Sequence, residues 1–149
     1  MITDRTAQDV ENAKTIRNTK IKEFEALTQE EIDTLERGMI TVNTINRIED
    51  KQAELKTLLN EVGYWNTPIV NKTWDGEDWQ YLEEWQRMLN NDEVLRQAFY
   101  VYAGTPITPD IRLDYINLNA VEKILYDLER MIVELKSQYR KCGTFVCGG

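Results

Sequence analysis

The stretch LNAVEKILYDLERMIVELKSQY, residues 118–139, decides the fold, because its apolar residues recur at alternating steps of three and four. This spacing places them on one face of a long helix, and an unbroken pattern favours packing against another long helix. A second, similar stripe runs over residues 45–62 and is interrupted by Gln52. The sequence therefore predicts two long helices packed side by side. The two stripes consist of Leu118, Val121, Leu125, Leu128, Ile132, Leu135 and Tyr139, and of Ile45, Ile48, Leu55, Leu59 and Val62.

Both stripes begin with nearly the same short pattern, INRIE at residues 45–49 and LNAVE at residues 118–122. An Asn at the N-cap accepts a hydrogen bond from a helix amide, and a Glu three residues later reaches back to the cap and favours the positive end of the helix dipole. We therefore interpret Asn46 with Glu49, and Asn119 with Glu122, as helix caps. The alternative is an acid–base pair of two glutamates, which needs a cleft with two unequal environments.

The beginning of the chain carries two further helix-start signals. Thr6 precedes Asp9 by three residues, and Thr28 with Glu31 forms a capping box. The helix that begins at Thr28 is expected to stop near Gly38, where a glycine suits a helix end. We expect these two helices to form a hairpin.

With 149 residues, the chain has the length of one domain that can bury a core of its own. The predicted fold class is mainly α, a compact bundle of about five helices with two long packed helices and a short extended or β tail at the C-terminus. The expected order is an N-terminal helical hairpin (1–38), a long helix (43–62), an aromatic-rich helical segment (63–102), a Pro-containing linker (103–115), a long C-terminal helix (116–141) and an extended tail (142–149).

All four tryptophans lie in the aromatic-rich segment. One helix is expected to begin near residues 75–78, and a second is expected over residues 91–99. The helical spacing of Trp79 and Trp85 predicts that both fill the core. Trp65 and Trp74 lie among Asn, Thr and Asp, so we predict that they are exposed and bind a partner protein or stack on a sugar ring.

The composition limits the chemistry that the chain can perform. The net charge is −8, which opposes binding to nucleic acid and gives no general attraction to anionic membranes, and no stretch is apolar enough to span a bilayer. The chain contains no His, which removes the commonest general base and metal ligand. It also lacks the glycine-rich motifs that cradle phosphates. We expect a protein that is not an enzyme and has no metal and no cofactor.

The last residues, KCGTFVCGG, resemble a short strand between glycines. A single strand cannot satisfy its own edges, so it either pairs with another segment of the chain, such as residues 67–72, or adds to the sheet of a partner. Phe145 and Val146 are therefore candidate partner-binding residues. Cys142 and Cys147 flank this segment, and their redox state depends on the compartment.

The order of five segments resembles a family of small proteins and modules found among the tail and baseplate genes of phages and prophages of low-GC Gram-positive bacteria. The match runs from one end of the chain to the other, although Ile45 and Ile48 stand where Leu and Val are commoner. None of the segments is a catalytic motif. The segments are ITDRTAQDV (2–10), LERGMITVNTINRIE (35–49), TWDGEDW (73–79), LNAVEKILYDLERMI (118–132) and YRKCGTFVCGG (139–149).

The resemblance implies a structural or accessory protein of the virion, assembled in the cytoplasm of the host bacterium. Its partners would be other tail, baseplate or fibre proteins, and self-association into a homo-oligomer is a further alternative. An alternative is a module that binds host cell-wall carbohydrate through Trp65 and Trp74. A third, weaker alternative is a wall hydrolase that uses paired carboxylates.

Overall fold

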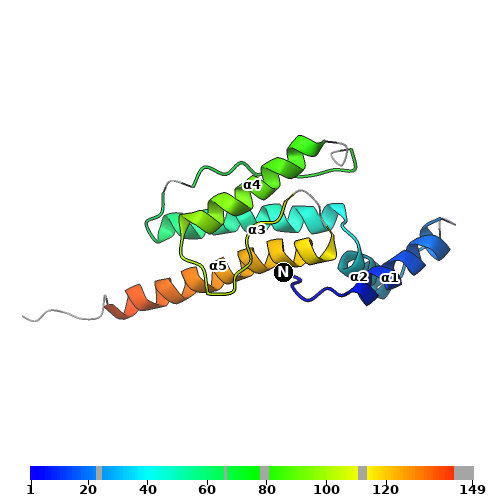
Figure 1. Ribbon diagram of the computed structural model, residues 1–149, viewed down its shortest axis with the longest axis horizontal. Helices are drawn as coiled ribbons and strands as arrows, with labels where there is room; N and C mark the ends of the chain where they lie inside the picture. The colour runs from blue at the N-terminus through cyan, green and yellow to red at the C-terminus, as the bar shows by residue number, and fades with distance from the viewer. Residues whose placement is uncertain (23–24, 66, 78–80, 111–113, 143–149) are drawn as a thin grey trace, which may run out of the picture.

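The computed structural model describes residues 1–22, 25–65, 67–77, 81–110 and 114–142, and within these ranges the chain consists of helices and loops without a strand (Figure 1). The mainly helical bundle that the sequence predicts is confirmed. The predicted extended or β tail, with Phe145 and Val146, lies outside the described residues. The elements are α1 (Ala7–Ile16), which continues as the π-helix η1 (Arg17–Ile21), then α2 (Gln29–Gly38), α3 (Val42–Glu61), α4 (Leu82–Ala98) and α5 (Tyr115–Cys142).

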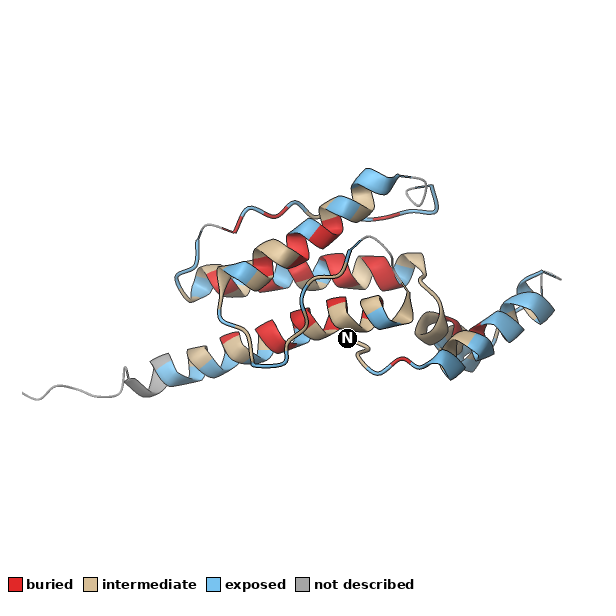
Figure 2. Ribbon diagram, in the orientation of Figure 1, coloured by how far each residue is buried: buried red, intermediate tan, exposed pale blue. Residues whose placement is uncertain are grey.

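Helices α3, α4 and α5 pack against one another and enclose the main core, and the two stripes face inward as predicted, over residues 45–62 of α3 and its C-cap and over residues 118–132 of α5. The buried residues lie on the facing sides of these helices (Figure 2). The polar interruption, Gln52, is fully buried and donates from its amide to the carbonyl of Met88, 3.0 Å away, and to Oδ1 of Asp92, 3.2 Å away. The fully buried apolar side chains here are Ile45, Ile48, Leu55 and Leu59 of α3, Met88 and Leu95 of α4, and Val121, Ile124, Leu125, Leu128 and Ile132 of α5.

The two early helix starts are confirmed, whereas the two later ones are wrong. Thr6 and Thr28 both form capping boxes, with Asp9 and Glu31 respectively. Helix α3 is capped by Thr41, whose hydroxyl accepts from the Thr44 amide. Helix α5 begins after Asp114, whose side chain accepts from the Asn117 amide at 2.9 Å.

Asn46, Glu49, Asn119 and Glu122 therefore lie inside their helices rather than at the caps. Thr and Asp cap a helix as well as Asn does, so the earlier Thr41 and Asp114 can begin these helices instead.

The aromatic-rich segment also differs from the prediction, because α4 is one continuous helix that begins at Leu82. Residues 75–77 form a bend, in which Asp75 accepts from the Glu77 amide at 2.8 Å. Asn91 and Asp92, which suggested a second helix start, are buried in the middle of α4. Trp79 lies outside the described residues, and Trp85 is half-buried against the core, as expected.

Helix α3 ends at a glycine with a positive φ. Gly63 has φ +97°, the Tyr64 amide donates to the Leu59 carbonyl, and the Gly63 amide donates to the Asn60 carbonyl. This pair of hydrogen bonds is a Schellman motif, which reverses the chain sharply after the helix. The chain leaves α3 with Tyr64 and Trp65 exposed, and residues 67–77 then run back beside α3 and α4 (Figure 1).

Helices α1 and α2 pack against each other at the end of the bundle where α3 and α5 begin (Figure 1). The contact is closest at Gly38, where an added Cβ would lie 2.0 Å from the Asp9 carbonyl oxygen and 2.6 Å from the Ala13 Cβ. Only a residue without a side chain fits between these two helices.

Candidate functional site

The first Asn–Glu pair holds the connection between α3 and α4. The Asn46 side chain accepts from the Trp74 amide at 2.7 Å and donates to the Trp74 carbonyl at 3.0 Å. One turn later, Glu49 accepts from Nε1 of the same Trp74 at 2.9 Å and from Arg87 of α4 at 2.5 Å. The pair therefore binds both the backbone and the side chain of one loop residue.

The second pair repeats this arrangement with the N-terminal segment. The Asn119 side chain accepts from the Arg5 amide at 3.1 Å and donates to the Arg5 carbonyl at 3.0 Å. Glu122 accepts from Nη2 of the same Arg5 at 2.9 Å and from Arg47 of α3 at 2.9 Å. We call the two arrangements the Trp74 clamp and the Arg5 clamp.

Both clamp glutamates are enclosed by their internal partners. Glu49 is 2% exposed and Glu122 is fully buried, and each forms an ion pair with an arginine. An acid–base pair of the glycosidase type needs two carboxyl groups that face a common cleft. The structure instead uses each carboxylate to fasten a separate segment of chain.

Trp74 is not the exposed binding residue that the sequence predicts, because its side chain is only 2% exposed. Its ring packs edge-on against Trp85, with the centroids 5.0 Å apart. The polar residues around Trp74 in the sequence suggested a solvent-facing loop. Its indole N–H donates to Glu49 inside the protein. The residues next to Trp74 in the sequence give no sign of this partner, so the prediction of exposure was wrong.

Trp65, by contrast, is 77% exposed, in agreement with the prediction. It belongs to a group of aromatic side chains, Tyr64, Trp65, Phe99 and Tyr100, which we call the aromatic end. Phe99 forms edge-to-face contacts with Tyr64 and Tyr100, at centroid distances of 5.0 and 6.2 Å. The group lies where α3 and α4 both terminate, so two chain reversals bring it together.

Two hollows at the aromatic end are both lined by Tyr64. One has a volume of about 350 Å³ and includes Trp65 and Thr67, and the other, of about 180 Å³, includes Phe99 and Tyr100. Trp65 beside the first hollow and Tyr100 beside the second are both largely exposed, so large aromatic surface faces water at each. The sequence analysis missed Tyr64, Phe99 and Tyr100, although the run AFYVY at residues 98–102 carried a second aromatic signal.

Asp92 lies in the core beside Gln52 and forms no ion pair with a described residue. Asp92 is fully buried, and its Oδ2 has no hydrogen-bond partner among the described residues. Burial raises the pKa of Asp92 to about 8, opposed by the hydrogen bond from Gln52 and assisted by the charge of Glu93. Asp92 is therefore protonated in the folded protein at neutral pH.

Two further features concern the described ranges as a whole. No group of three or more His, Cys, Asp or Glu side chains is arranged there to hold a metal ion. No helix in that part of the chain has both the length and the apolar character needed to cross a bilayer.

Comparison of the chain with protein-family models, with curated proteins and with solved structures gives no match in any of the three.

Proposed function

We propose that this chain is a structural or accessory virion protein of a phage tail, baseplate or fibre, and that it acts in assembly through protein–protein contacts. The order of sequence segments supports the class of protein. The aromatic end supports the mode of action, because it exposes Trp65 and Tyr100 next to two hollows. Aromatic side chains are enriched among the residues that contribute most to protein interfaces.

The aromatic end suits docking because its backbone is held in place before a partner arrives. Tyr64 and Trp65 follow the Schellman motif of α3, and Phe99 follows α4 directly. The Trp74 clamp also joins α3 to α4 through Glu49 and Arg87. A surface that is already ordered loses less conformational entropy on binding. A partner would insert side chains into the two hollows that Tyr64 lines.

The test is incorporation into particles. Phage would be produced with the wild-type chain, with Trp65→Ala, or with Tyr81→Ala, an exposed aromatic at the start of α4 and outside the aromatic end. We expect purified particles to contain the wild-type and Tyr81→Ala chains in equal amount and to be depleted of Trp65→Ala. Electron microscopy with a labelled chain would show where it lies. Absence of the wild-type chain from particles, or equal incorporation of all three, would contradict the proposal.

Binding of host cell-wall carbohydrate is the second candidate function, and the exposure of Trp65 is the observation that favours it. The ring could stack on a sugar, with the larger hollow beside it. Of the two tryptophans that the sequence suggested, only Trp65 is accessible. Sedimentation with purified cell walls tests this directly: carbohydrate binding predicts that the wild-type chain co-sediments and that Trp65→Ala does not. Co-sedimentation of both would contradict a site at Trp65.

A further inference from the structure

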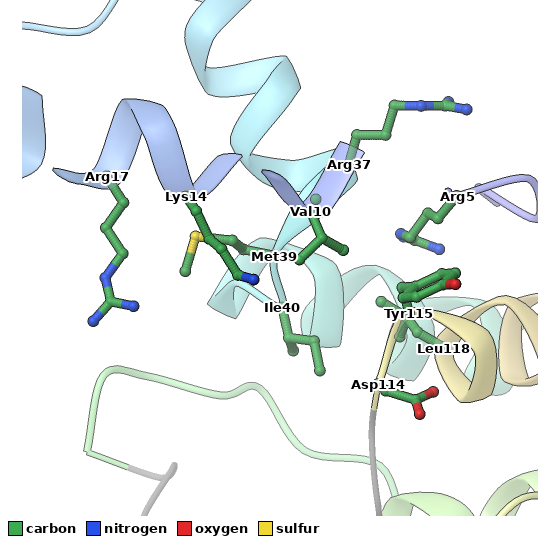
Figure 3. Close-up of a pocket in the computed structure, with 11 residues that line it drawn as sticks. Arg5, Val10, Lys14, Arg17, Arg37, Met39, Ile40, Asp114, Tyr115 and Leu118 are labelled. Atoms are coloured by element: carbon green, nitrogen blue, oxygen red, sulfur yellow. The ribbon is translucent and has the colours of Figure 1, made fainter. Parts of the chain in front are cut away.

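A cavity of about 330 Å³ lies between the N-terminal helices and the bundle (Figure 3), at the end opposite the one where α3 and α4 terminate (Figure 1). It is bounded by α1 and η1, by the end of α2 with the residues that follow it, by the beginning of α5, and by Arg5. The close contact of α1 with α2 at Gly38 sets one side of it. Its lining includes Arg5, Val10, Lys14, Arg17, Ile40 and Leu118.

The cavity combines an apolar surface with positive charge. Val10, Ile40 and Leu118 contribute the apolar part, and the lining includes four cationic residues and one acidic residue, Asp114. This local excess runs against the whole chain, which has 26 acidic and 18 basic residues. An apolar cavity with a few charged groups is the usual form of a site for a small molecule.

Some of this positive charge is already balanced within the protein. Arg5 pairs with Glu122 at 2.9 Å, and Lys14 pairs with the exposed Glu11 at 2.6 Å. Arg37, the fourth cation, pairs with Asp4 and Asp9. The charge available to a ligand therefore comes chiefly from Arg17, which forms no ion pair with a described residue, and from Lys14, whose surface pair is readily exchanged.

Arg5 supplies a second observation. Its side chain is buried, yet its Nε–H has no acceptor among the described residues. Burial lowers the pKa of Arg5, and the charges of Arg47 and Arg37 act in the same direction, against the opposing effect of Glu122. A buried donor without an acceptor is rare and often marks the place of a missing water molecule or ion. Because Arg5 is already paired with Glu122, it lines one wall of the cavity and is not assigned a direct contact with the ligand.

The helix itself changes form at the cavity. The α-helical hydrogen bonds of α1 give way to a π-helix at Arg17, where the Lys22 amide donates to the Arg17 carbonyl at 3.2 Å. Such π-helical turns are uncommon and are frequently found at functional sites. The π-helix begins at Arg17, the cationic cavity residue that forms no ion pair with a described residue.

We propose that this cavity binds a small amphipathic carboxylate, with its apolar body against Val10, Ile40 and Leu118 and its carboxylate held by Arg17 and Lys14. A volume of about 330 Å³ is at the small end of the usual range for ligand sites, which favours a short acyl or aryl acid over a long-chain lipid. Arginine binds carboxylates with paired, charge-assisted hydrogen bonds. This site is independent of the aromatic end and of the proposed role in assembly.

The first test is isothermal titration calorimetry of the full chain with octanoate. Octan-1-ol and octylammonium have the same alkyl chain without the negative charge, and acetate has the charge without the alkyl chain. We expect saturable binding of one octanoate, about tenfold tighter than that of any of the other three, which corresponds to one charge-assisted hydrogen bond. Octanol binding as tightly as octanoate, or no saturable octanoate binding, would overturn the proposal.

Variants then locate the site. Arg17→Glu and Lys14→Glu should each weaken octanoate binding by about tenfold, because each replaces an attraction by a repulsion. Lys22→Glu makes the same change of charge at an exposed residue just beyond η1 and outside the cavity lining, so it should leave the affinity unchanged. All three side chains are exposed, and thermal unfolding would check that each variant folds. An equal loss in Lys22→Glu would show general attraction of anions rather than this cavity.

Discussion

The Trp74 clamp and the Arg5 clamp have the same geometry but enclose very different groups. The Trp74 clamp buries an indole, and its arginine, Arg87, keeps a side-chain exposure of 22%. The Arg5 clamp buries a guanidinium of 1% side-chain exposure against a fully buried carboxylate. The same pair of side chains on a helix can therefore hold an apolar or a charged residue, at different cost in desolvation.

The two clamps also differ in how completely their polar atoms are satisfied. In the Arg5 clamp, Nε of both Arg5 and Arg47 is buried without a partner among the described residues. In the Trp74 clamp, Glu49 also accepts from Asn71 at 3.0 Å and from the Lys72 amide at 3.3 Å. The Trp74 clamp is therefore a well-satisfied part of the bundle, whereas the Arg5 clamp ties the N-terminal segment to α5 and leaves two buried N–H groups without a described partner.

The largest expected effect is a pH dependence of the free energy of unfolding. It arises at Asp92, which accepts a hydrogen bond from Gln52 of α3, the helix that carries the Trp74 clamp. The folded protein holds Asp92 protonated up to about pH 8, whereas the unfolded chain releases the proton near its ordinary pKa of 3.8. The free energy of unfolding should therefore fall as the pH rises from about 4 to about 8. The loss would reach at most about 6 kcal/mol, since each pKa unit corresponds to about 1.4 kcal/mol.

Asp92→Asn isolates this contribution, because Asn stays neutral. We expect wild type and Asp92→Asn to have similar stability near pH 4 and the variant to be the more stable above pH 8, by urea unfolding at several pH values. A constant difference between the two chains over this range would show that Asp92 does not titrate as described.

The next largest effect is expected at the Arg5 clamp. Glu122→Gln would leave Arg5 buried without its negative partner and would remove one of the two carboxylates that pair with Arg47, which keeps its pair with Glu36 at 3.7 Å. Removal of one member of a buried ion pair typically costs about 3 to 5 kcal/mol, and we expect this range in urea unfolding. A cost below about 1 kcal/mol would mean that water reaches Arg5 and that the clamp contributes little.

Glu49→Gln should cost less, about 1 to 3 kcal/mol, and so sharpens the comparison. Gln can still accept from the Trp74 indole, and Arg87 keeps its ion pair with Glu84 at 2.9 Å and its contact with water. The same unfolding measurement applies. A cost for Glu49→Gln greater than for Glu122→Gln would reverse our ranking of the two clamps.

An effect of similar size is expected for Gly38→Ala, which tests the hairpin without touching either clamp. The new Cβ would collide with the Asp9 backbone and with Ala13, so α1 and α2 must separate slightly, at a cost of about 1 to 3 kcal/mol. Amide hydrogen exchange should quicken in α1 and α2 and stay unchanged in α3. Faster exchange throughout α3 would show that the hairpin and the bundle unfold together.

The sequence predicted α3 and α5 because apolar residues at regular helical spacing lie on one face of a helix, and that face is stable only when it is buried. It could not decide the role of Asn46 and Asn119. An Asn followed three residues later by Glu is the spacing of a cap and also the spacing of two neighbours on one helix face. Only the distant partners, Trp74 and Arg5, distinguish the two roles.

The tryptophans also show that local sequence does not determine whether a side chain is buried. Local polarity suggested that Trp65 and Trp74 share one environment, yet one is exposed and the other is buried. The aromatic end and the cavity near Arg17 each combine residues from separate helices, so no short stretch of sequence contains either site. Periodicity predicts helices well, and the sites depend on how those helices meet.

The most direct test of the clamps is amide hydrogen exchange by NMR in the Asn46→Ala variant. A clamp predicts that the Trp74 amide, which donates to Asn46 at 2.7 Å, loses its protection while the Glu49 amide inside α3 keeps its own. A helix cap at Asn46 predicts the opposite, faster exchange at Glu49 and no change at Trp74. The second result would contradict the account of Asn46 as a residue that holds a distant loop.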